Sequence, residues 1–493
     1  MANFKKTMLA SAGGGDGGWM AQISSSSSSG TTQFEGARGF ACRFLSDDSV
    51  IQQQLRRQGN SYYTTWTKWT PDGDLDFHKK AAGGSRIDTT QLNIFVDYDD
   101  NDKIHVRSSS TGISGTEING IDANITSYSY DKHTGGQSPT GFAWAPVLSR
   151  IYHYSVPYGI MYGYRTTDGA ASAKVTYVNV SGDNMGLDNG FMGSNTMGAC
   201  WRENSGNNLI ASKLLYDARP GQWKKRTVIG KASNDRQIVA PNIATTNYTQ
   251  GASISSDYDL YAAGQNKAKG QTNWNYVVKY NNSNGSLAAA KIIEINASAG
   301  LTQSHTGARG MAVGSDGQAW IVMGENKDEF IIIHLSSNLT LIKALKFKRN
   351  GVGYNEDFSN WQSGGNYHGI DLNSDGSALA FTCYVLSPYG SFRTHVTFKI
   401  PSDLSITDGY YPFPMTTAGV TGFAGDGTNN LYSGDASVHI TDVTSSVTVI
   451  DAAYTTNVDY SLSGSETSIG GVGSDTKTIG SDSLFLDYGP ENL

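Results

Sequence analysis

The chain has 493 residues, of which 16% are charged and 38% hydrophobic, and its net charge is −7. Because binding to phosphates requires clustered cations, an acidic chain without a long run of Lys or Arg is not expected to have nucleic acid as a partner. No run of roughly 18 apolar residues occurs, so no membrane span is expected either.

A high glycine content and many tyrosines indicate a chain of short strands. The sequence contains 58 glycines and 27 tyrosines, where about 7% glycine, or roughly 35 residues, is usual. Glycine allows the backbone conformations of tight turns, and tyrosine suits the half-buried face of a sheet. The composition therefore predicts an all-β protein.

Residues 1–36 are expected to form an extended N-terminal arm rather than part of the repeated fold. Glycine and serine runs at 13–18 and 24–29 offer too little apolar surface to offset the entropy lost on ordering. Trp19, Met20 and Phe34 nevertheless interrupt this segment. Two interpretations stay open: an arm that becomes ordered only against other subunits, with these side chains as anchors, or a plain flexible tail.

A short motif recurs along residues 37–414 and indicates a repeat. Residues 37–41 (ARGFA) match residues 308–312 (ARGMA) almost letter for letter. The starts of the units lie about 50–60 residues apart, a spacing typical of propeller blades. Seven units can be counted in this way, and six or eight remain alternatives. Two of the seven units contain the matching motifs at 37–41 and 308–312. The other five begin near Gln91 and at Gly141, Gly190, Gly251 and Gly369.

Each unit follows the same order of four expected strands, which is clearest in the unit that starts at 308. Its first strand ends in an Asp- and Gly-rich turn at 314–317, and further strands are expected at 318–322, 330–335 and 341–347. Residues 50–57 also fit a short helix, but their place in the repeat predicts a second strand. Four antiparallel strands repeating at this period predict a β-propeller over residues 37–414.

Residues 415–493 are expected to form a small C-terminal β appendage rich in Ser, Thr, Gly and Asp. Short alternating stretches occur at 438–440, 446–450 and 460–462. Strands this brief cannot form a core alone. We therefore expect the appendage to pack on a partner or on the rim of the propeller.

Two acidic loops have the composition of calcium sites. Residues 371–376 (Asp-Leu-Asn-Ser-Asp-Gly) match the first half of an EF-hand loop, but the twelfth position, where Glu is needed, is Thr382. Residues 97–102 contain four carboxylates, those of Asp97, Asp99, Asp100 and Asp102. Both segments also suit ordinary turns, because Asp, Asn and Gly are favoured there for backbone reasons. We expect turns at both places, with calcium binding left as the alternative.

No other motif points to catalysis or to a cofactor. The histidines show no HExxH or H-x-H grouping, and Cys42, Cys200 and Cys383 lack the spacing of zinc ligands. Because three is an odd number, we expect buried free thiols rather than a disulfide framework. No catalytic residue, metal or cofactor is therefore assigned. Aromatic residues expected in loops either stack on sugars or pack between strands; they are Tyr154, Tyr158, Tyr162, Tyr164, Trp274, Trp361, Tyr367 and Tyr389.

The first 15 residues (MANFKKTMLASAGGG) resemble the leader of virion structural proteins from tailed, marine-type bacteriophages. The resemblance extends to the layout, because those proteins join such a leader to propeller-like repeats and a β tail rich in Ser, Thr and Asp. It implies a virion protein that is assembled in the host cytoplasm and contacts other virion proteins and copies of itself. No functional residue is carried over.

The expected function is therefore that of a structural protein in the phage tail or its fibres, with propeller loops that meet a partner or a host surface glycan. A capsid decoration or vertex protein is the alternative. A propeller glycosidase acting on host polysaccharide is a second alternative, and it would require carboxylates paired in one central funnel.

Overall fold

The computed structural model describes residues 3–11, 17–24, 32–33, 41–58, 61–81, 85–86, 94–110, 116–133, 139–145, 150–155, 160–167, 169, 171–178, 185–192, 196–205, 208–217, 249–250, 260–266, 274–280, 287–296, 307–326, 329–350, 370–386, 393–412, 437–451, 463–467 and 485–487. Their regular structure is β-strand apart from two short 3-10 turns, η1 (Tyr98–Asp100) and η4 (Thr444–Ser446). The chain is therefore all-β, as its composition predicts. No helix in the described ranges is long and apolar enough to cross a membrane.

The described strands form seven antiparallel sheets, numbered 1 to 7 in chain order. Sheet 1 contains β3 (Thr32–Gln33), β4 (Ala41–Phe44), β5 (Val50–Gln58), β6 (Ser61–Trp69), β7 (Leu75–Ala81) and β35 (Phe485–Asp487). Sheet 2 contains β8 (Ser85–Arg86), β9 (Ile94–Asp97), β10 (Lys103–Ser110), β11 (Thr116–Ile121) and β12 (Tyr128–His133). Sheet 3 contains β13 (Pro139–Ala145), β14 (Arg150–Ser155), β15 (Ile160–Arg165), β16 (Ala171–Val178) and β34 (Ser463–Thr467).

The second half of the chain supplies the other four sheets. Sheet 4 contains β17 (Met185–Met192), β18 (Thr196–Ser205) and β19 (Asn208–Asp217), and sheet 5 contains β20 (Thr249–Gln250), β21 (Leu260–Asn266), β22 (Trp274–Tyr280), β23 (Leu287–Ile295) and β33 (Val447–Asp451). Sheet 6 contains β24 (Gly307–Val313), β25 (Ala319–Asn326), β26 (Glu329–Leu335), β27 (Leu341–Asn350), β31 (Gly409–Pro412) and β32 (Ser437–Asp442). Sheet 7 contains β28 (Ile370–Leu372), β29 (Ala378–Leu386), β30 (Arg393–Pro401), β1 (Asn3–Met8) and β2 (Trp19–Ser24).

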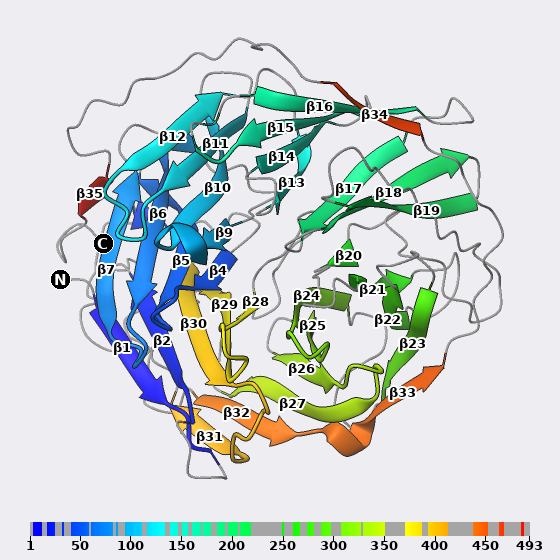
Figure 1. Ribbon diagram of the computed structural model, residues 1–493. Coiled ribbons are helices and arrows are strands. Elements are labelled where there is room, and N and C mark those ends of the chain that lie inside the picture. Colours follow the sequence, from blue (N-terminus) through cyan, green and yellow to red (C-terminus); the bar gives the residue numbers. More distant parts are fainter. Residues whose placement is uncertain are drawn as a thin grey trace.

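The strands agree with the repeat seen in the sequence. Residues 50–57 lie in β5, so the strand prediction is confirmed over the helix that their periodicity also allows. The unit that starts at 308 forms β24 to β27 in the expected order. The motifs at 141, 190 and 310 lie in the first strands of sheets 3, 4 and 6, while Gly251 and Gly369 lie outside the described residues. In Figure 1 the sheets follow one another around a common centre in chain order.

Apolar cores fill the spaces between four pairs of sheets in the described part: 1 and 2, 5 and 6, 6 and 7, and 7 and 1. One joins sheets 5 and 6 and includes Val277 and Ile333, and another joins sheets 1 and 2 and includes Trp66 and Ile104. Between sheets 6 and 7, Phe330 and Phe347 stack with ring centroids 4.7 Å apart, and Phe381 and Phe398 stack at 4.6 Å. The two stacks meet edge to face, the arrangement that the charge distribution of aromatic rings favours.

A five-residue turn recurs between the strands of these sheets, and its fourth residue adopts the left-handed backbone conformation. In the turn after β6, Gly73 donates its N–H to the Thr70 carbonyl, and Thr70 donates its own to Asp74. Gly73 and Gly317 adopt φ +82°, where a side chain is disfavoured. Leu339, at φ 59°, occupies the same position and is fully buried. Its burial, worth about 1.5–3 kcal/mol, offsets the strain of roughly 1–2 kcal/mol.

The strands of residues 415–493 do not pair with one another in the described ranges. β32, β33, β34 and β35 each add to the last strand of a different sheet, namely β27, β23, β16 and β7. Figure 1 shows them in orange and red on the outside of these sheets. They therefore lie at the outer edges of four different sheets and are not gathered in one appendage. Pairing on an edge strand satisfies backbone groups that would otherwise face solvent.

The N-terminal segment also belongs to a sheet of the same chain. β1 and β2 form a hairpin, and β2 pairs with β30 along residues 19–23. Trp19 is 2% exposed and Met20 is fully buried. The expectation that these anchors become ordered only against other subunits is therefore wrong for both, because sheet 7 supplies the edge strand and the apolar contacts. Phe34 lies outside the described residues.

Candidate functional site

The most distinctive polar site lies where sheet 7 meets sheet 1, close to the centre of the molecule in Figure 1. Arg43, on β4, is almost fully buried. Its Nε donates to the carbonyl oxygen of Ile94 on β9 at 2.9 Å. Its Nη1 lies 3.2 Å from the carbonyl of Cys42 and 3.4 Å from that of Ile370 on β28. One guanidinium therefore connects strands of three sheets, namely β4 of sheet 1, β9 of sheet 2 and β28 of sheet 7.

Asp371 on β28 is the charge partner of this arginine. Its Oδ1 lies 3.6 Å from Arg43 Nη1, and its Oδ2 accepts the backbone N–H of Phe44 at 2.9 Å. Burial raises the pKa of the Asp371 carboxyl, and Arg43 and the Phe44 N–H oppose this shift. If either charge were removed, the other would be left largely buried without its partner, which is costly.

Two neighbouring groups are kept neutral by the same environment. Burial is the main cause that raises the pKa of the Cys42 thiol, and the charge of Asp371 adds to it. The prediction of a buried free thiol is confirmed for Cys42. Burial likewise raises the pKa of Tyr98, whose hydroxyl donates to the Phe44 carbonyl at 3.3 Å. Since the nucleophile is the thiolate, Cys42 is inert here.

A small cavity of about 160 Å³ opens beside the ion pair. Its wall comes from β4, β24, β28 and the turns that follow β24 and β28, and includes Arg43, Val313, Ser315, Asp371 and Asn373. Among the described residues of this wall, Asp371 is the only carboxylate. Glycoside hydrolysis normally requires two carboxylates on either side of the bond that is cleaved. The cavity as described therefore does not provide the pair that the glycosidase alternative requires.

A second polar network crosses the same boundary between the sheets, farther from the centre. Gln52 on β5 donates through Nε2 to Thr382 Oγ1 on β29 at 2.7 Å. Its Oε1 accepts from Thr397 Oγ1 on β30, also at 2.7 Å, and from Trp69 Nε1 at 3.5 Å. Gln52, Thr382 and Thr397 are completely buried. Because each group has a partner, the network binds sheet 1 to sheet 7 without leaving an unsatisfied amide.

The loop at 371–376 forms a hairpin turn, as expected. Gly376, at φ +76°, donates its N–H to the Asn373 carbonyl, and Asn373 donates its own to Ala378. The Asn373 side chain accepts the Ala378 N–H at 2.8 Å and donates to Asp48 Oδ1 at 3.2 Å. Asp375 accepts the N–H of Ser377 at 2.8 Å. Asp371 points toward Arg43 instead, so this loop does not gather its carboxylates around one point.

The carboxylates of residues 97–102 also diverge. Asp97 accepts the N–H of Asp99, and its carboxylate lies 3.7 Å from His105 Nε2; the proximity of His105 is the main cause that lowers the pKa of Asp97. Asp100 pairs with Lys103 at 3.0 Å. Asp102, with φ 58°, accepts hydrogen bonds from the backbone N–H and the hydroxyl of Ser46 in sheet 1. No group of three or more His, Cys, Asp or Glu side chains in the described ranges is placed to hold a metal ion.

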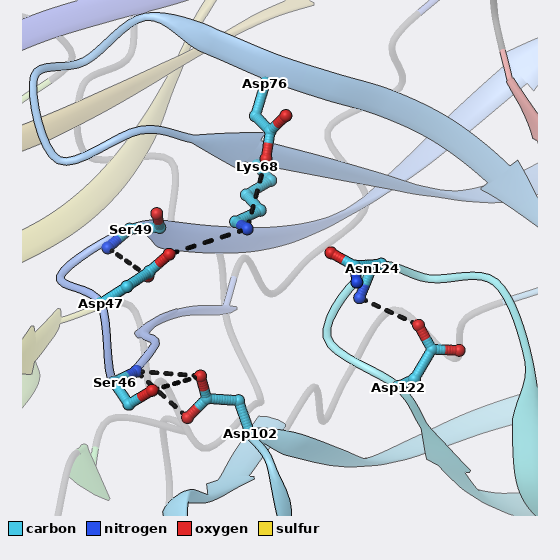
Figure 2. A network of polar contacts seen from close by, with 8 residues as sticks. All are labelled: Ser46, Asp47, Ser49, Lys68, Asp76, Asp102, Asp122 and Asn124. Carbon is cyan, nitrogen blue, oxygen red and sulfur yellow. Dashed lines mark hydrogen bonds and ion pairs between the residues drawn. The ribbon is translucent and has the colours of Figure 1, made fainter.

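Figure 2 shows how these acidic turns connect sheets 1 and 2. Ser46, in the turn after β4, donates to Asp102 through its N–H at 3.1 Å and its hydroxyl at 2.7 Å. Lys68 on β6 lies between Asp76, at 3.2 Å, and Asp47, at 3.9 Å. The carboxylates close turns and link neighbouring sheets, and they do not converge on a common ligand.

Three buried histidines were not recognised in the sequence. His78, His105 and His334 lie in strands of sheets 1, 2 and 6, and all are nearly or fully buried. His105 Nδ1 lies 2.9 Å from the Tyr130 hydroxyl, and burial lowers the pKa of His105. An alternating strand pattern could have placed these residues on a buried face. It could not have identified their partners.

Of the aromatic residues considered as sugar contacts, Tyr164 is buried; the side chains of the others lie outside the described part.

His334 leads to a prediction about acid stability. Its ring stacks on Trp320, with centroids 4.6 Å apart. Burial lowers the pKa of His334 from 6.5 to about 4, against the opposing charges of Asp316 and Asp403. The unfolded chain therefore binds a proton at this residue between pH 6.5 and about 4 while the folded chain does not. We expect stability to fall as the pH falls through this window.

The measurement is urea unfolding at intervals between pH 7 and pH 4, for the wild type and for His334→Gln. The variant cannot titrate at this position, so its stability is expected to fall less steeply over the window. Burial also lowers the pKa of His105. The stability of His334→Gln is therefore still expected to fall to some extent as the pH is lowered. Identical slopes for the two proteins would contradict the assignment to His334.

Comparisons with known proteins identify no family. No family model matches the chain, and no curated protein matches it. Among solved structures, hydrazine synthase of Kuenenia stuttgartiensis is similar over 73% of this chain and 95% of that chain, with 13% sequence identity and a TM-score of 0.44. A similarity at this level carries no information about activity.

Proposed function

We propose that the chain is a structural protein of a bacteriophage particle, located in the tail or its fibres. In this proposal its seven sheets are the blades of a β-propeller that serves as a rigid platform. The fold part rests on the recurrence of the four-strand unit and on the contacts between sheets 7 and 1, which are far apart in sequence. The virion part rests on the N-terminal leader and on the order of leader, repeats and C-terminal strands.

The observation that carries a structural role is the use made of the buried polar groups. Arg43, Asp371 and Gln52 all lie at the boundary between sheets 7 and 1. Each is bonded to the backbone or side chains of a neighbouring sheet. Groups used in this way stabilise one arrangement of the sheets.

The added outer strands support the same role. Five of the seven sheets receive strands from the N-terminal or C-terminal parts of the chain, namely sheets 1, 3, 5, 6 and 7. These additions cover strand edges that would otherwise be open to pairing with other chains.

The test is immunogold labelling of purified particles with antibodies against this chain, combined with mass spectrometry of the particle proteins. We expect the chain to be present in stoichiometric amounts and the label to lie on the tail. Label on the capsid shell or at its vertices would favour a decoration or vertex protein. If the chain is absent from purified particles, the virion proposal is wrong.

A further inference from the structure

A second and larger cavity lies between the N-terminal hairpin and the turns of sheets 1 and 7. Its volume is about 550 Å³, within the range of roughly 300–1,000 Å³ that is usual for small-molecule sites. The hairpin contributes Met8, Gly18 and Trp19 to its wall. The turn that contains Asp72 and the end of β30 provide the opposite sides.

The polar groups of the wall include three carboxylates, each with acceptor positions that are not engaged in a hydrogen bond within the described part. Among the described residues the Asp72 carboxylate has no hydrogen-bond partner, and its residue is exposed. Asp48 and Asp403 each use one oxygen, accepting from Asn373 and from the N–H of Ser405. Their second oxygens have no partner within the described part. Three carboxylates with free acceptor positions therefore face one cavity.

One cation accompanies these carboxylates. Lys399 Nζ donates to the carbonyl of Pro71 at 3.2 Å and lies 5.7 Å from the ring centroid of Phe44. An ammonium has three protons, so Lys399 can donate to a ligand as well. The charged side chains in the wall are Asp48, Asp72, Asp403 and Lys399, which makes an anionic ligand unfavourable.

The remaining wall is apolar and includes Met8, Pro71 and Ile400. Met8 is 56% exposed, so its side chain is accessible to a ligand in the cavity. The site thus combines several acceptors, one strong donor and an apolar side. A sugar ring matches this combination, because its hydroxyls donate to carboxylates and accept from an ammonium while its C–H face needs an apolar contact.

We infer that this cavity binds a neutral pyranose, either as a free monosaccharide or as the end of a glycan. The use of such a site for contact with a host glycan rests on the proposed function; the binding itself does not. The geometry also gives the N-terminal hairpin a second role, because Met8, Gly18 and Trp19 complete the cavity that the turns of sheets 1 and 7 leave open.

The test is saturation-transfer NMR on the full chain with the methyl glycosides of glucose, galactose, mannose and N-acetylglucosamine. We expect transfer to at least one of them, and a loss of affinity of about tenfold in Asp72→Asn, because a hydrogen bond to a charged acceptor is replaced by a weaker one to a neutral amide. Asp72 has no intramolecular bond in the described part, so this variant should fold normally; circular dichroism checks this.

The matched control is Asp76→Asn, which makes the same change of charge on the same hairpin outside the cavity. It should bind like the wild type. The inference is overturned if no sugar binds, if Asp72→Asn binds as well as Asp76→Asn, or if cadaverine binds and the sugars do not. A chain found in particles that binds no sugar would contradict this inference alone. A chain that binds sugar but is absent from particles would contradict only the proposed function.

Discussion

Replacing Trp19 with alanine is expected to lower the free energy of unfolding by about 3–5 kcal/mol, the usual cost of removing a buried tryptophan. The indole is 2% exposed, lies 6.2 Å from the ring of Trp69 and donates to the Pro71 carbonyl at 2.9 Å. It also lies directly on Gly73, where an added Cβ would be 2.5 Å from a ring atom. Trp19 therefore fastens the N-terminal hairpin across sheets 7 and 1.

The measurement is urea unfolding of the isolated full-length protein, followed by circular dichroism. Met8→Ala is the control, because Met8 belongs to the same hairpin but is largely exposed, and a surface change of this kind usually alters stability by about 0.5 kcal/mol or less. A loss of similar size in both variants would mean that the hairpin is not anchored through Trp19. A plain flexible tail would show no loss in either.

Replacing Arg43 with methionine is expected to cost about 3–5 kcal/mol, because the change leaves the buried Asp371 without its charge partner. It also removes the donor to the Ile94 carbonyl. The double variant Arg43→Met with Asp371→Asn should be more stable than the single variant. The amide removes the unpaired charge and can still accept the N–H of Phe44.

The pH dependence of the single variant gives a second measurement. The pKa of Asp371 already lies above its usual value in the wild type, and loss of Arg43 raises it further. A carboxyl whose pKa is raised on folding stabilises the folded state at acid pH and loses that contribution as the pH rises. The difference between wild type and Arg43→Met should therefore shrink as the pH is lowered below neutral.

The control for this pair is Lys68→Met. Lys68 pairs with Asp47 and Asp76, whose side chains are 57% and 44% exposed. Exposed pairs contribute roughly 0–1 kcal/mol, so the loss should be small and largely independent of pH. If Arg43→Met costs no more than Lys68→Met, the ion pair does not hold sheets 7 and 1 together.

The sequence alone was sufficient for features whose cause is local. The all-β class follows from composition, β5 from its place in the repeat, and the turns at 314–317 and 371–376 from their Asp, Asn and Gly residues. Alternation and turn chemistry act between residues only a few positions apart, so they are visible in one stretch of sequence. Local chemistry does not predict that Leu339 adopts the left-handed conformation, because this conformation usually requires Gly.

Tertiary structure alone decided which distant residues meet. Phe44 and Asp371 are 327 positions apart, and Gln52 and Thr382 are 330 apart; no periodicity in the sequence links either pair. The N-terminal anchors were expected to pack on another subunit because their own segment has no core, whereas the edge of β30 and the indole of Trp69 supply one. Likewise, the strands after residue 415 find partners in sheets 6, 5, 3 and 1, because an open strand edge accepts any strand that reaches it in register.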